Sequence, residues 1–153
     1  NSEEPACCMY ENDPANGERY GLLYNWHAAH TGKLCPEGWH VPSVAEWEVL
    51  NTYLGGNAGA VLTSTEGWCD TWGDSLPEYQ GTDAYGFTAL PGGARKWNGF
   101  ETLGAKATWW TTNTASLSPL SAPYARLDAT DQALTTGSSW GKETGCSVRC
   151  VKD

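Results

Sequence analysis

The stretch CPEGWHVPSVAEWEVL, residues 35–50, predicts a helix with a rigid entrance. Ser43 is a preferred residue type at a helix N-cap, and Glu46, three positions later, completes a capping box. Apolar residues follow at helical spacing, which gives the helix one apolar face. Glycines at 55–56 then end it, because glycine readily adopts the conformation required beyond the last turn. We therefore predict a helix over 44–54.

Outside this helix, the sequence predicts short strands separated by long loops. Residues 1–19 contain turn-forming residues and are expected to be an N-terminal loop or arm, followed by a single domain over 20–153. Residues 20–30 predict a strand that runs into a short helix. Other segments are strand-like because they are rich in β-branched and aromatic residues: 87–90, 107–112, 124–129 and 147–151. One or two helices followed by short strands indicate an α+β fold.

The composition excludes several classes of function. The chain has 153 residues, the size of one domain, and a net charge of −9 from 18 acidic and 9 basic residues. Without a basic stripe, neither nucleic acid nor an anionic membrane surface is an expected partner, and no apolar run predicts membrane insertion. Six cysteines without a C-x-x-C motif favour disulfides and an oxidising compartment, with 15 pairings open.

The segment 111–139 has a distinct composition. Thr, Ser and Ala supply 16 of its 29 residues, and large apolar side chains are few. Because such a stretch cannot build a core by itself, we expect it to lie on the surface, held by the strands around it.

Several motifs occur in an order that resembles one family. They are YGLLYNW, CPEGWHVPSVAEWEVL, LTSTEGW, YGFTALPGG, WWTT and SVRCVKD. Together they resemble the Fibrobacter succinogenes major paralogous domain, from about NDPAN to the last residue. The resemblance implies a C-type lectin-like fold with short twisted antiparallel sheets, stabilised by disulfides and related to the formylglycine-generating enzymes. It also implies a secreted or surface-attached bacterial protein.

The resemblance also suggests which cysteines pair. Cys35 and Cys150 both stand in recurrent cysteine motifs of the family, so we expect a bond between them. Cys69 with Cys146 is the second expected pair, although the family gives no cysteine at either position. Cys7 and Cys8 are adjacent, so at least one is expected to reach a distant partner or another chain.

Ligand binding through 111–145 is the function that we predict. C-type lectin-like domains usually present ligands with the loops and strands of this region, and small polar residues with a few anchors make an adaptable surface. Arg126 is expected to clamp a carboxylate and Trp140 to stack on a sugar or peptide, so the ligand is a protein or carbohydrate. The Ser/Thr/Ala-rich composition of 111–139 also suggests the hypothesis that a retroelement diversifies this segment, as in some related domains. The predicted binding residues are Asn113, Thr114, Ser116, Tyr124, Arg126, Asp128, Asp131, Thr136, Ser138 and Trp140.

Two other functional classes remain as alternatives. A structural subunit of an extracellular filament or matrix, or a homo-oligomer, would suit the vicinal cysteines and the lack of the family's usual leading strands, because an assembled chain can borrow a strand. An oxidase like the formylglycine-generating enzymes would use a cysteine pair to bind copper, but the sequence context of the active enzymes is missing. We therefore expect no catalysis.

Metal binding is not predicted, although calcium stays open. His27 and His30 could share a helical face, with His40 as a third ligand, but ordinary hydrogen bonds are the expected role of all three. The sugar-binding calcium motifs of C-type lectins do not occur. Carboxylates could still hold a hard cation through oxygen. They are Asp70, Asp74, Glu78, Asp83, Asp128 and Asp131.

Overall fold

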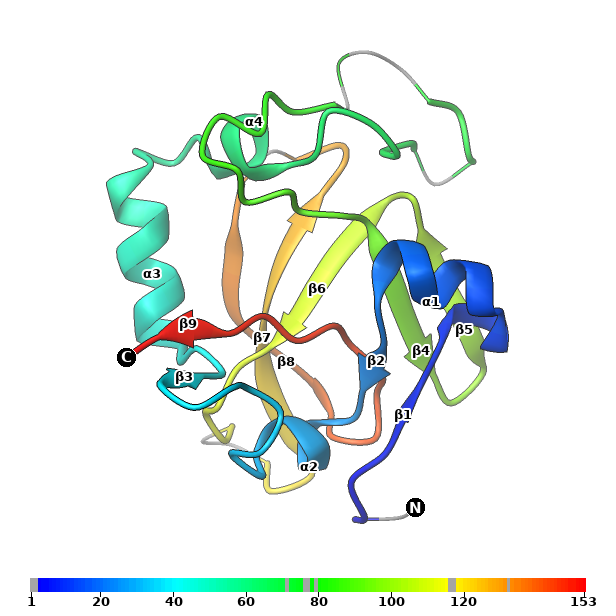
Figure 1. The fold of residues 1–153 in the computed structure, drawn as a ribbon, viewed down its shortest axis with the longest axis vertical. Coiled ribbons are helices and arrows are strands. Elements are labelled where there is room, and N and C mark those ends of the chain that lie inside the picture. The colour runs from blue at the N-terminus through cyan, green and yellow to red at the C-terminus, as the bar shows by residue number, and fades with distance from the viewer. Residues whose placement is uncertain (1–2, 71, 76–77, 79, 116–117, 132) are drawn as a thin grey trace.

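Four small antiparallel sheets and four short α-helices make up the described part of the chain (Figure 1). The structure is a computed structural model that describes residues 3–153, except 71, 76–77, 79, 116–117 and 132. The helices are η1 (Tyr10–Asn12, 3₁₀), α1 (Pro14–Tyr20), α2 (Trp26–Ala29), α3 (Val44–Tyr53) and α4 (Ala58–Leu62). The strands are β1 (Cys7–Cys8), β2 (Leu23–Tyr24), β3 (Trp39–His40), β4 (Gly92–Lys96), β5 (Gly99–Leu103), β6 (Lys106–Trp110), β7 (Ser121–Asp128), β8 (Thr135–Gly141) and β9 (Val151–Lys152). The fold is therefore α+β, as predicted.

The largest sheet has the order β6-β7-β8 and carries most of the core. Its middle strand β7 is buried over much of its length, and Ala122, Ala125 and Leu127 are fully buried. Alanines at these positions leave room for large rings, so tryptophans pack directly against the strand. The remaining sheets each have two strands, and they pair β1 with β2, β3 with β9 and β4 with β5.

Helix α3 confirms the prediction from the opening motif. The Ser43 hydroxyl accepts a hydrogen bond from the Glu46 N–H at 3.3 Å, and the Glu46 carboxylate accepts one from the Ser43 N–H at 2.8 Å. These reciprocal bonds are the predicted capping box. The buried Trp47 fixes the apolar face of α3, because its ring stacks on Trp109 of β6 at 5.3 Å between centroids. The helix therefore packs on the central sheet.

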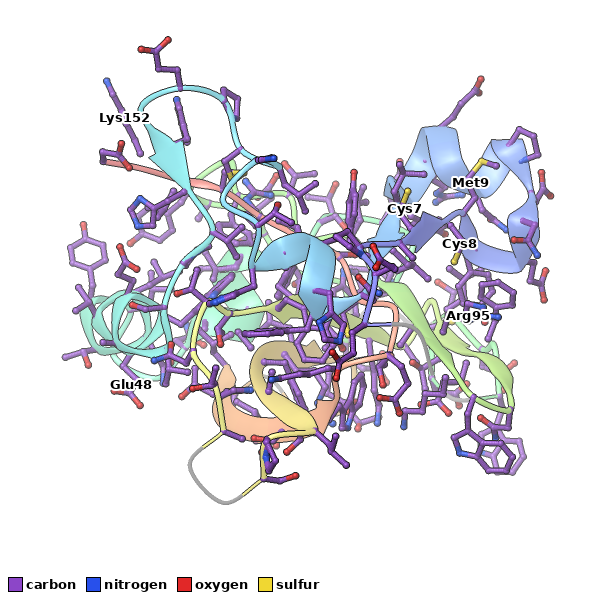
Figure 2. All side chains as sticks on the ribbon, turned by 90° about the horizontal axis from the view of Figure 1, so that it is seen from below. Cys7, Cys8, Met9, Glu48, Arg95 and Lys152 are labelled. Carbon is purple, nitrogen blue, oxygen red and sulfur yellow. A yellow bond between two sulfur atoms is a disulfide. The ribbon has the colours of Figure 1, made fainter. Side chains whose placement is uncertain are left out.

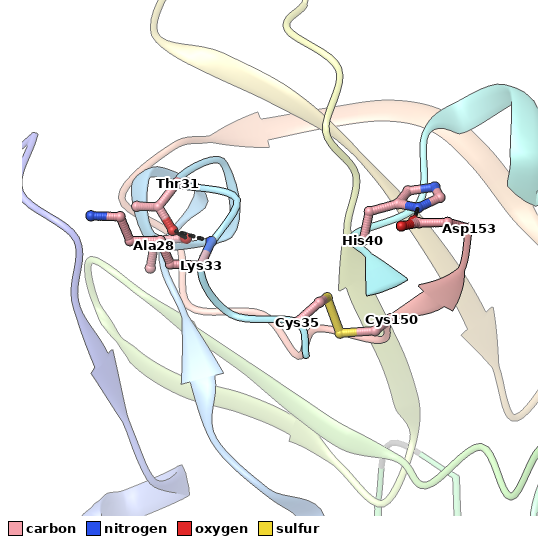
Figure 3. Close-up of a disulfide and its surroundings, with 7 residues drawn as sticks. All are labelled: Ala28, Thr31, Lys33, Cys35, His40, Cys150 and Asp153. Carbon is pink, nitrogen blue, oxygen red and sulfur yellow. Dashed lines mark hydrogen bonds and ion pairs between the residues drawn. A yellow bond between two sulfur atoms is a disulfide. The ribbon is translucent and has the colours of Figure 1, made fainter. Parts of the chain in front are cut away.

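A disulfide joins the entrance of α3 to the end of the chain. Cys35 and Cys150 are bonded, with their Cα atoms 5.8 Å apart (Figure 3). Just beyond this bond, β3 pairs with β9, with Trp39 opposite Lys152 and His40 opposite Val151. The expected pair is thus formed, and it fixes the segment before α3 to the last strand.

The predicted second disulfide is wrong. Cys69 and Cys146 are both thiols, and they lie in different parts of the fold. Cys146 is buried in a cluster with Trp26 and Trp110, whereas the backbone N–H of Cys69 binds the carbonyl of Gly104 in the loop after β5. Burial raises the pKa of the Cys146 thiol well above its usual range, so this sulfur behaves as a small apolar group.

The first residues contain more regular structure than the loop expected over 1–19. Asp13 caps helix α1 by accepting a hydrogen bond from the Ala15 N–H at 2.9 Å, and Pro14 occupies the first helical position. Strand β1 pairs with β2, and the Cys7 and Cys8 side chains point in different directions from it (Figure 2). Both are thiols, with Cys7 exposed and Cys8 half-buried.

The segment 111–139 also differs from its expected surface position. Its part within β7 is core, whereas the residues of β8 are half-buried or exposed. The small number of large apolar residues did not indicate this burial, because the buried residues of β7 include alanines that pack against tryptophans. The strand predicted over 147–151 is also shorter: Ser147 forms an isolated bridge with Trp109, and β9 begins at Val151.

Candidate functional site

A groove with small side chains lies beside the exposed strand β8. It has a volume of about 350 Å³ and is formed by the loop after β6, the start of β7 and the part of β8 that pairs with it. We call it the β8 groove; its lining residues are Thr114, Ala115, Ser118, Ser121, Pro123, Gly137 and Ser139. No lining side chain carries a charge, so shape and neutral hydrogen bonds would decide what it binds.

The position of β8 makes the groove accessible. Within the described part of the chain, β8 is an edge strand whose one strand neighbour is β7. Its residues from Gly137 to Ser139 are exposed, and Gly137 has a φ of 77°, a conformation in which glycine is unstrained. The strand therefore offers backbone groups as well as serine hydroxyls to a partner.

The predicted binding residues are only partly gathered here. Thr114 lines the groove, while Thr136 is half-buried and Ser138 is exposed on the same strand without lining it. Ser116 lies outside the described residues. The sequence prediction missed most lining residues, including Ser118, because single small residues carry no distinctive signal.

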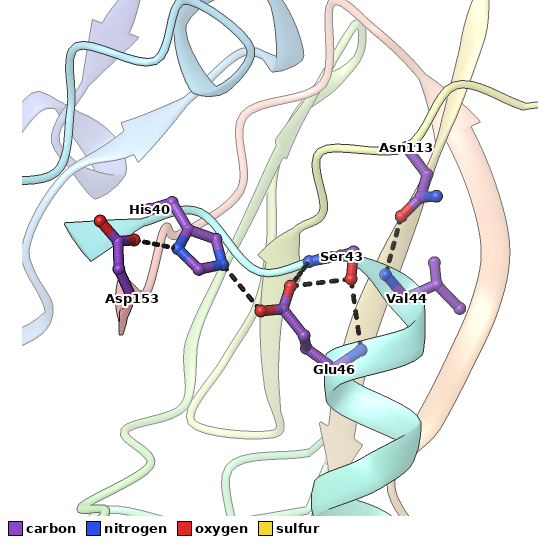
Figure 4. Close-up of polar contacts among 6 residues, drawn as sticks. All are labelled: His40, Ser43, Val44, Glu46, Asn113 and Asp153. Atoms are coloured by element: carbon purple, nitrogen blue, oxygen red, sulfur yellow. Dashed lines mark hydrogen bonds and ion pairs between the residues drawn. The ribbon is translucent and has the colours of Figure 1, made fainter. Parts of the chain in front are cut away.

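Asn113 has a structural partner that the sequence did not reveal. Its side-chain oxygen accepts a hydrogen bond from the backbone N–H of Val44 at 2.7 Å (Figure 4). That N–H belongs to the first turn of α3, where backbone donors lack partners within the helix. Asn113 therefore ties the loop after β6 to α3.

Tyr124 is not the surface anchor that we expected. Only 4% of it is exposed, and its ring packs against Trp140 with centroids 4.5 Å apart. Trp140 is half-buried and is covered by the Lys96 ammonium group at 4.3 Å from its ring. Tyr124 belongs to the buried cluster that contains Trp26, Trp110 and Cys146, and Trp140 packs against that cluster. The apolar area of both rings is therefore largely covered within the fold.

Arg126 is likewise held by the domain rather than presented at its surface. Its guanidinium lies 5.9 Å from the Tyr124 ring, and its Nε is buried with no hydrogen-bond partner among the described residues. The half-buried side chain is not among the residues that line the β8 groove. The expected carboxylate clamp is therefore not part of that site.

Asp128 and Asp131 lie at the other end of the hairpin, in or next to the turn between β7 and β8. Asp128 forms an ion pair with Lys106 at 3.2 Å, and Asp131 accepts a hydrogen bond from the Ala133 N–H at 3.2 Å. Both carboxylates serve local structure. The described members of the predicted set therefore do not form one site, and among them Thr114 alone lines the groove.

The family match covers nearly all of this structure. Residues 1–152 match the model for the Fibrobacter succinogenes major domain. The chain belongs to this family. No curated protein and no solved structure matches the chain significantly. The family assignment supports the resemblance found in the ordered motifs, including those that form α3 and its disulfide.

In this Fibrobacter succinogenes major domain, His40 joins the chain end to α3. Its Nδ1 lies 2.6 Å from a carboxylate oxygen of Asp153, and its Nε2 lies 2.7 Å from one of Glu46 (Figure 4). The hydrogen bonds to Asp153 and Glu46 raise the pKa of His40 above its ordinary value of 6.5. Burial would raise the pKa of Glu46, but hydrogen bonds from Ser43 and His40 outweigh it and lower that pKa below 4.5.

These shifts define a pH window for the contact. The raised pKa of His40 means that its contribution to stability is fully present below pH 6.5 and is lost as pH rises through the folded-state value. The lowered pKa of Glu46 means that its contribution is present above pH 4.5 and is lost as pH falls through the folded-state value. Both contributions are complete between these two values.

The other candidate metal ligands have local roles. His30 stacks on Trp26 at 4.2 Å between centroids, and the ring of His27 contacts the same tryptophan edge-on at 5.9 Å. Asp70 accepts hydrogen bonds from the N–H groups of Trp72 and Asp74 at 2.8 and 2.9 Å. Within the described residues, no three His, Cys, Asp or Glu side chains gather in a way that could hold a metal ion.

A helix both long and apolar enough to cross a bilayer does not occur among the described residues.

Proposed function

We propose that this protein is a non-catalytic ligand-binding domain that uses the β8 groove. The observation that carries this proposal is an accessible groove of small side chains, placed at the edge of a sheet whose other face packs into the cluster of Trp26, Trp110 and Tyr124. A groove without charged walls suits a peptide or protein segment, because backbone groups of an edge strand can pair with an extended chain. The proposed partner is therefore a protein, with carbohydrate as the other ligand class.

The proposed setting is the outside of a bacterial cell, in a C-type lectin-like fold. The disulfide between Cys35 and Cys150 supports an oxidising compartment, because such bonds persist mainly outside the cytosol. The disulfide and the packed core hold the domain independently of the edge strand β8, which is compatible with sequence variation at the groove. Diversification by a retroelement, restricted to 111–145, stays a hypothesis, and sibling copies would reject it if their differences were spread evenly.

A matched pair of variants on β8 tests the site. Ser139 lines the groove, whereas Ser138 is an exposed neighbour that does not. After a protein and glycan array identifies a ligand, Ser139→Arg is expected to weaken its binding by about tenfold or more, because a large charged side chain fills the groove. Ser138→Arg is expected to bind like the wild type. Equal binding by both variants and the wild type, or equal loss in both, would contradict the proposal.

A structural subunit is the second candidate, and two observations favour it. Strand β8 is an exposed sheet edge, and Cys7 is an exposed thiol on another edge strand. Together they would allow strand pairing and an intermolecular disulfide. Size-exclusion chromatography with and without reductant distinguishes the two functions, because a monomer under both conditions would exclude a covalent or stable assembly.

The oxidase alternative gains no support from the cysteines near the chain end. Cys150 is consumed by the disulfide, and Cys146 is fully buried. A copper site needs two accessible thiolates, so these two residues do not supply one. We do not propose this activity.

A further inference from the structure

A second cavity lies between α3 and the last strand, on a different part of the surface from the β8 groove. It has a volume of about 320 Å³. Its apolar walls come from α3, the segment before it, the loop before β4 and β9: Trp39, Trp47, Leu50, Phe87 and Val151. Figure 1 shows β9 ending beside the start of α3, and residues of both elements line the cavity. We call it the Arg149 cavity after the one arginine that lines it.

An aromatic cluster gives this cavity a rigid floor. Trp47 stacks on Trp109, and the ring of Phe87 meets both edge-on, with centroid distances of 6.1 and 5.9 Å. The guanidinium of Arg149 lies over the Phe87 ring, 3.9 Å from its centroid. Stacking of this kind fixes the plane of a guanidinium while leaving its N–H groups at the edge available.

Arg149 has no ion pair and no hydrogen bond from its guanidinium to another described residue. Asp83 is the charged residue that acts on Arg149 electrostatically, and its two oxygens accept hydrogen bonds from the Thr88 N–H and hydroxyl. Burial lowers the pKa of Arg149, so its charge is partly desolvated without a bonded counter-ion. Such a group gains from a ligand that brings an anion to it.

The other polar groups around the cavity favour an anionic ligand. Glu46 is also in the wall, but its oxygens accept hydrogen bonds from Ser43 and His40. Lys152 lines the mouth and adds a second positive charge. The indole N–H of Trp47 is a buried donor with no acceptor among the described residues. This excess of donors and cations occurs in a protein whose net charge is −9.

We propose that the Arg149 cavity binds a small aromatic carboxylic acid. The carboxylate accepts hydrogen bonds from the guanidinium of Arg149, and the ring occupies the space between Trp39 and Leu50. The volume limits the ligand to about the size of one aromatic amino acid, near the lower end for small-molecule sites. This site does not depend on the function proposed for the β8 groove.

N-acetyl-L-phenylalanine and its amide form a matched pair of probes, because they differ in the carboxylate alone. Each is titrated into the isotope-labelled protein, and the indole N–H signals of the tryptophans are followed by nuclear magnetic resonance. The acid is expected to shift a subset of these signals in a saturable way, and the amide to bind about tenfold or more weakly, the usual effect of removing a charged hydrogen-bond partner.

Three variants test the role of the arginine. Arg149→Gln is expected to weaken binding of the acid by about tenfold or more and to abolish the preference over the amide. Arg149→Lys keeps the charge but loses the planar fork, so an intermediate loss is expected. Arg95→Gln is the control, because Arg95 is exposed on β4 and lies on the other side of the molecule from Lys152 (Figure 2). It removes the same charge and is expected to leave binding unchanged.

Several outcomes would overturn the proposal. The first is a lack of saturable binding of the acid to the wild type. The second is equal binding of the acid and the amide, and the third is an equal loss of binding in the Arg149 and Arg95 variants. A hexapeptide ending in phenylalanine that binds more tightly than the free acid would overturn the small-molecule assignment in favour of a polypeptide C-terminus. If Arg149→Gln misfolds, the comparison is made with Arg149→Lys, and a dispersed spectrum of that variant shows that it is folded. Changes at the β8 groove are expected to have no effect in this assay.

Discussion

Removing the disulfide between Cys35 and Cys150 tests how much this bond contributes to the stability of the domain. The double variant Cys35→Ser/Cys150→Ser opens the covalent loop while changing two half-buried sulfurs to hydroxyls. The bond spans a sequence separation of 115, so it closes a loop that contains most residues of the unfolded chain. We expect the variant to fold with greatly reduced stability.

The magnitude follows from the loop length. In the chain-entropy description, closing a loop with the separation of 115 seen here contributes about 4.8 kcal/mol at 25 °C. For a domain of this size, that loss lowers the melting temperature by about 10–20 °C. It is a large part of the total, because domains are usually stable by about 5–15 kcal/mol.

Urea unfolding followed by tryptophan fluorescence measures this loss. The control is Cys7→Ser, which removes an exposed thiol outside the disulfide and is expected to unfold like the wild type. Reductant should lower the stability of the wild type by a similar amount and leave the double variant unchanged. A double variant within about 1 kcal/mol of the wild type would refute the entropic reasoning, since the loop would then contribute little.

Three other predictions concern the stability of the fold. The urea midpoint of the wild type should fall as pH rises above 6.5, because charged His40 loses its proton there. The midpoint of His40→Gln should not show this fall, and a parallel fall in both proteins would exclude His40 as its cause. Gly93→Ala should cost about 3 kcal/mol or more, because its φ is +65° and the new Cβ meets backbone atoms at 2.6 and 2.8 Å. Gly86→Ala, with φ +64° and open space, should cost about 1–2 kcal/mol, and equal melting temperatures for the two would contradict the steric argument. Asn113→Ala should cost about 1 kcal/mol without changing ligand affinity, whereas a loss of binding with unchanged stability would restore the asparagine to the ligand site.

Local signals in the sequence were sufficient where the physics is local. The capping box of Ser43 and Glu46 depends on residues three apart, so α3 could be predicted from sequence alone. Asp13 followed by Pro14 carried a similar N-terminal signal for α1, and the loop expectation overlooked it. The dipeptide Asn98-Gly99 is likewise a turn signal, and it lies at the turn between β4 and β5.

The candidate site could be predicted only as a region. Thr114 and Ser139 meet in one groove because the loop after β6 lies beside the β7–β8 hairpin, and no sequence spacing encodes that approach. Tyr124 was misplaced because residue type alone does not show which face of a strand enters the core. The Arg149 cavity was missed altogether, since its walls come from four separate segments.

The sequence by itself determined the α+β class, helix α3 and, through the family motifs, the pairing of Cys35 with Cys150. Each depends on short-range backbone chemistry or on an ordered set of motifs. Tertiary structure alone decided that the alanines of β7 are buried against tryptophans and that Arg149 lies over Phe87 without an ion pair to any other residue that the structure describes. Burial and the absence of a counter-ion are properties of three-dimensional packing, because they depend on which distant segments displace water from the same side chain.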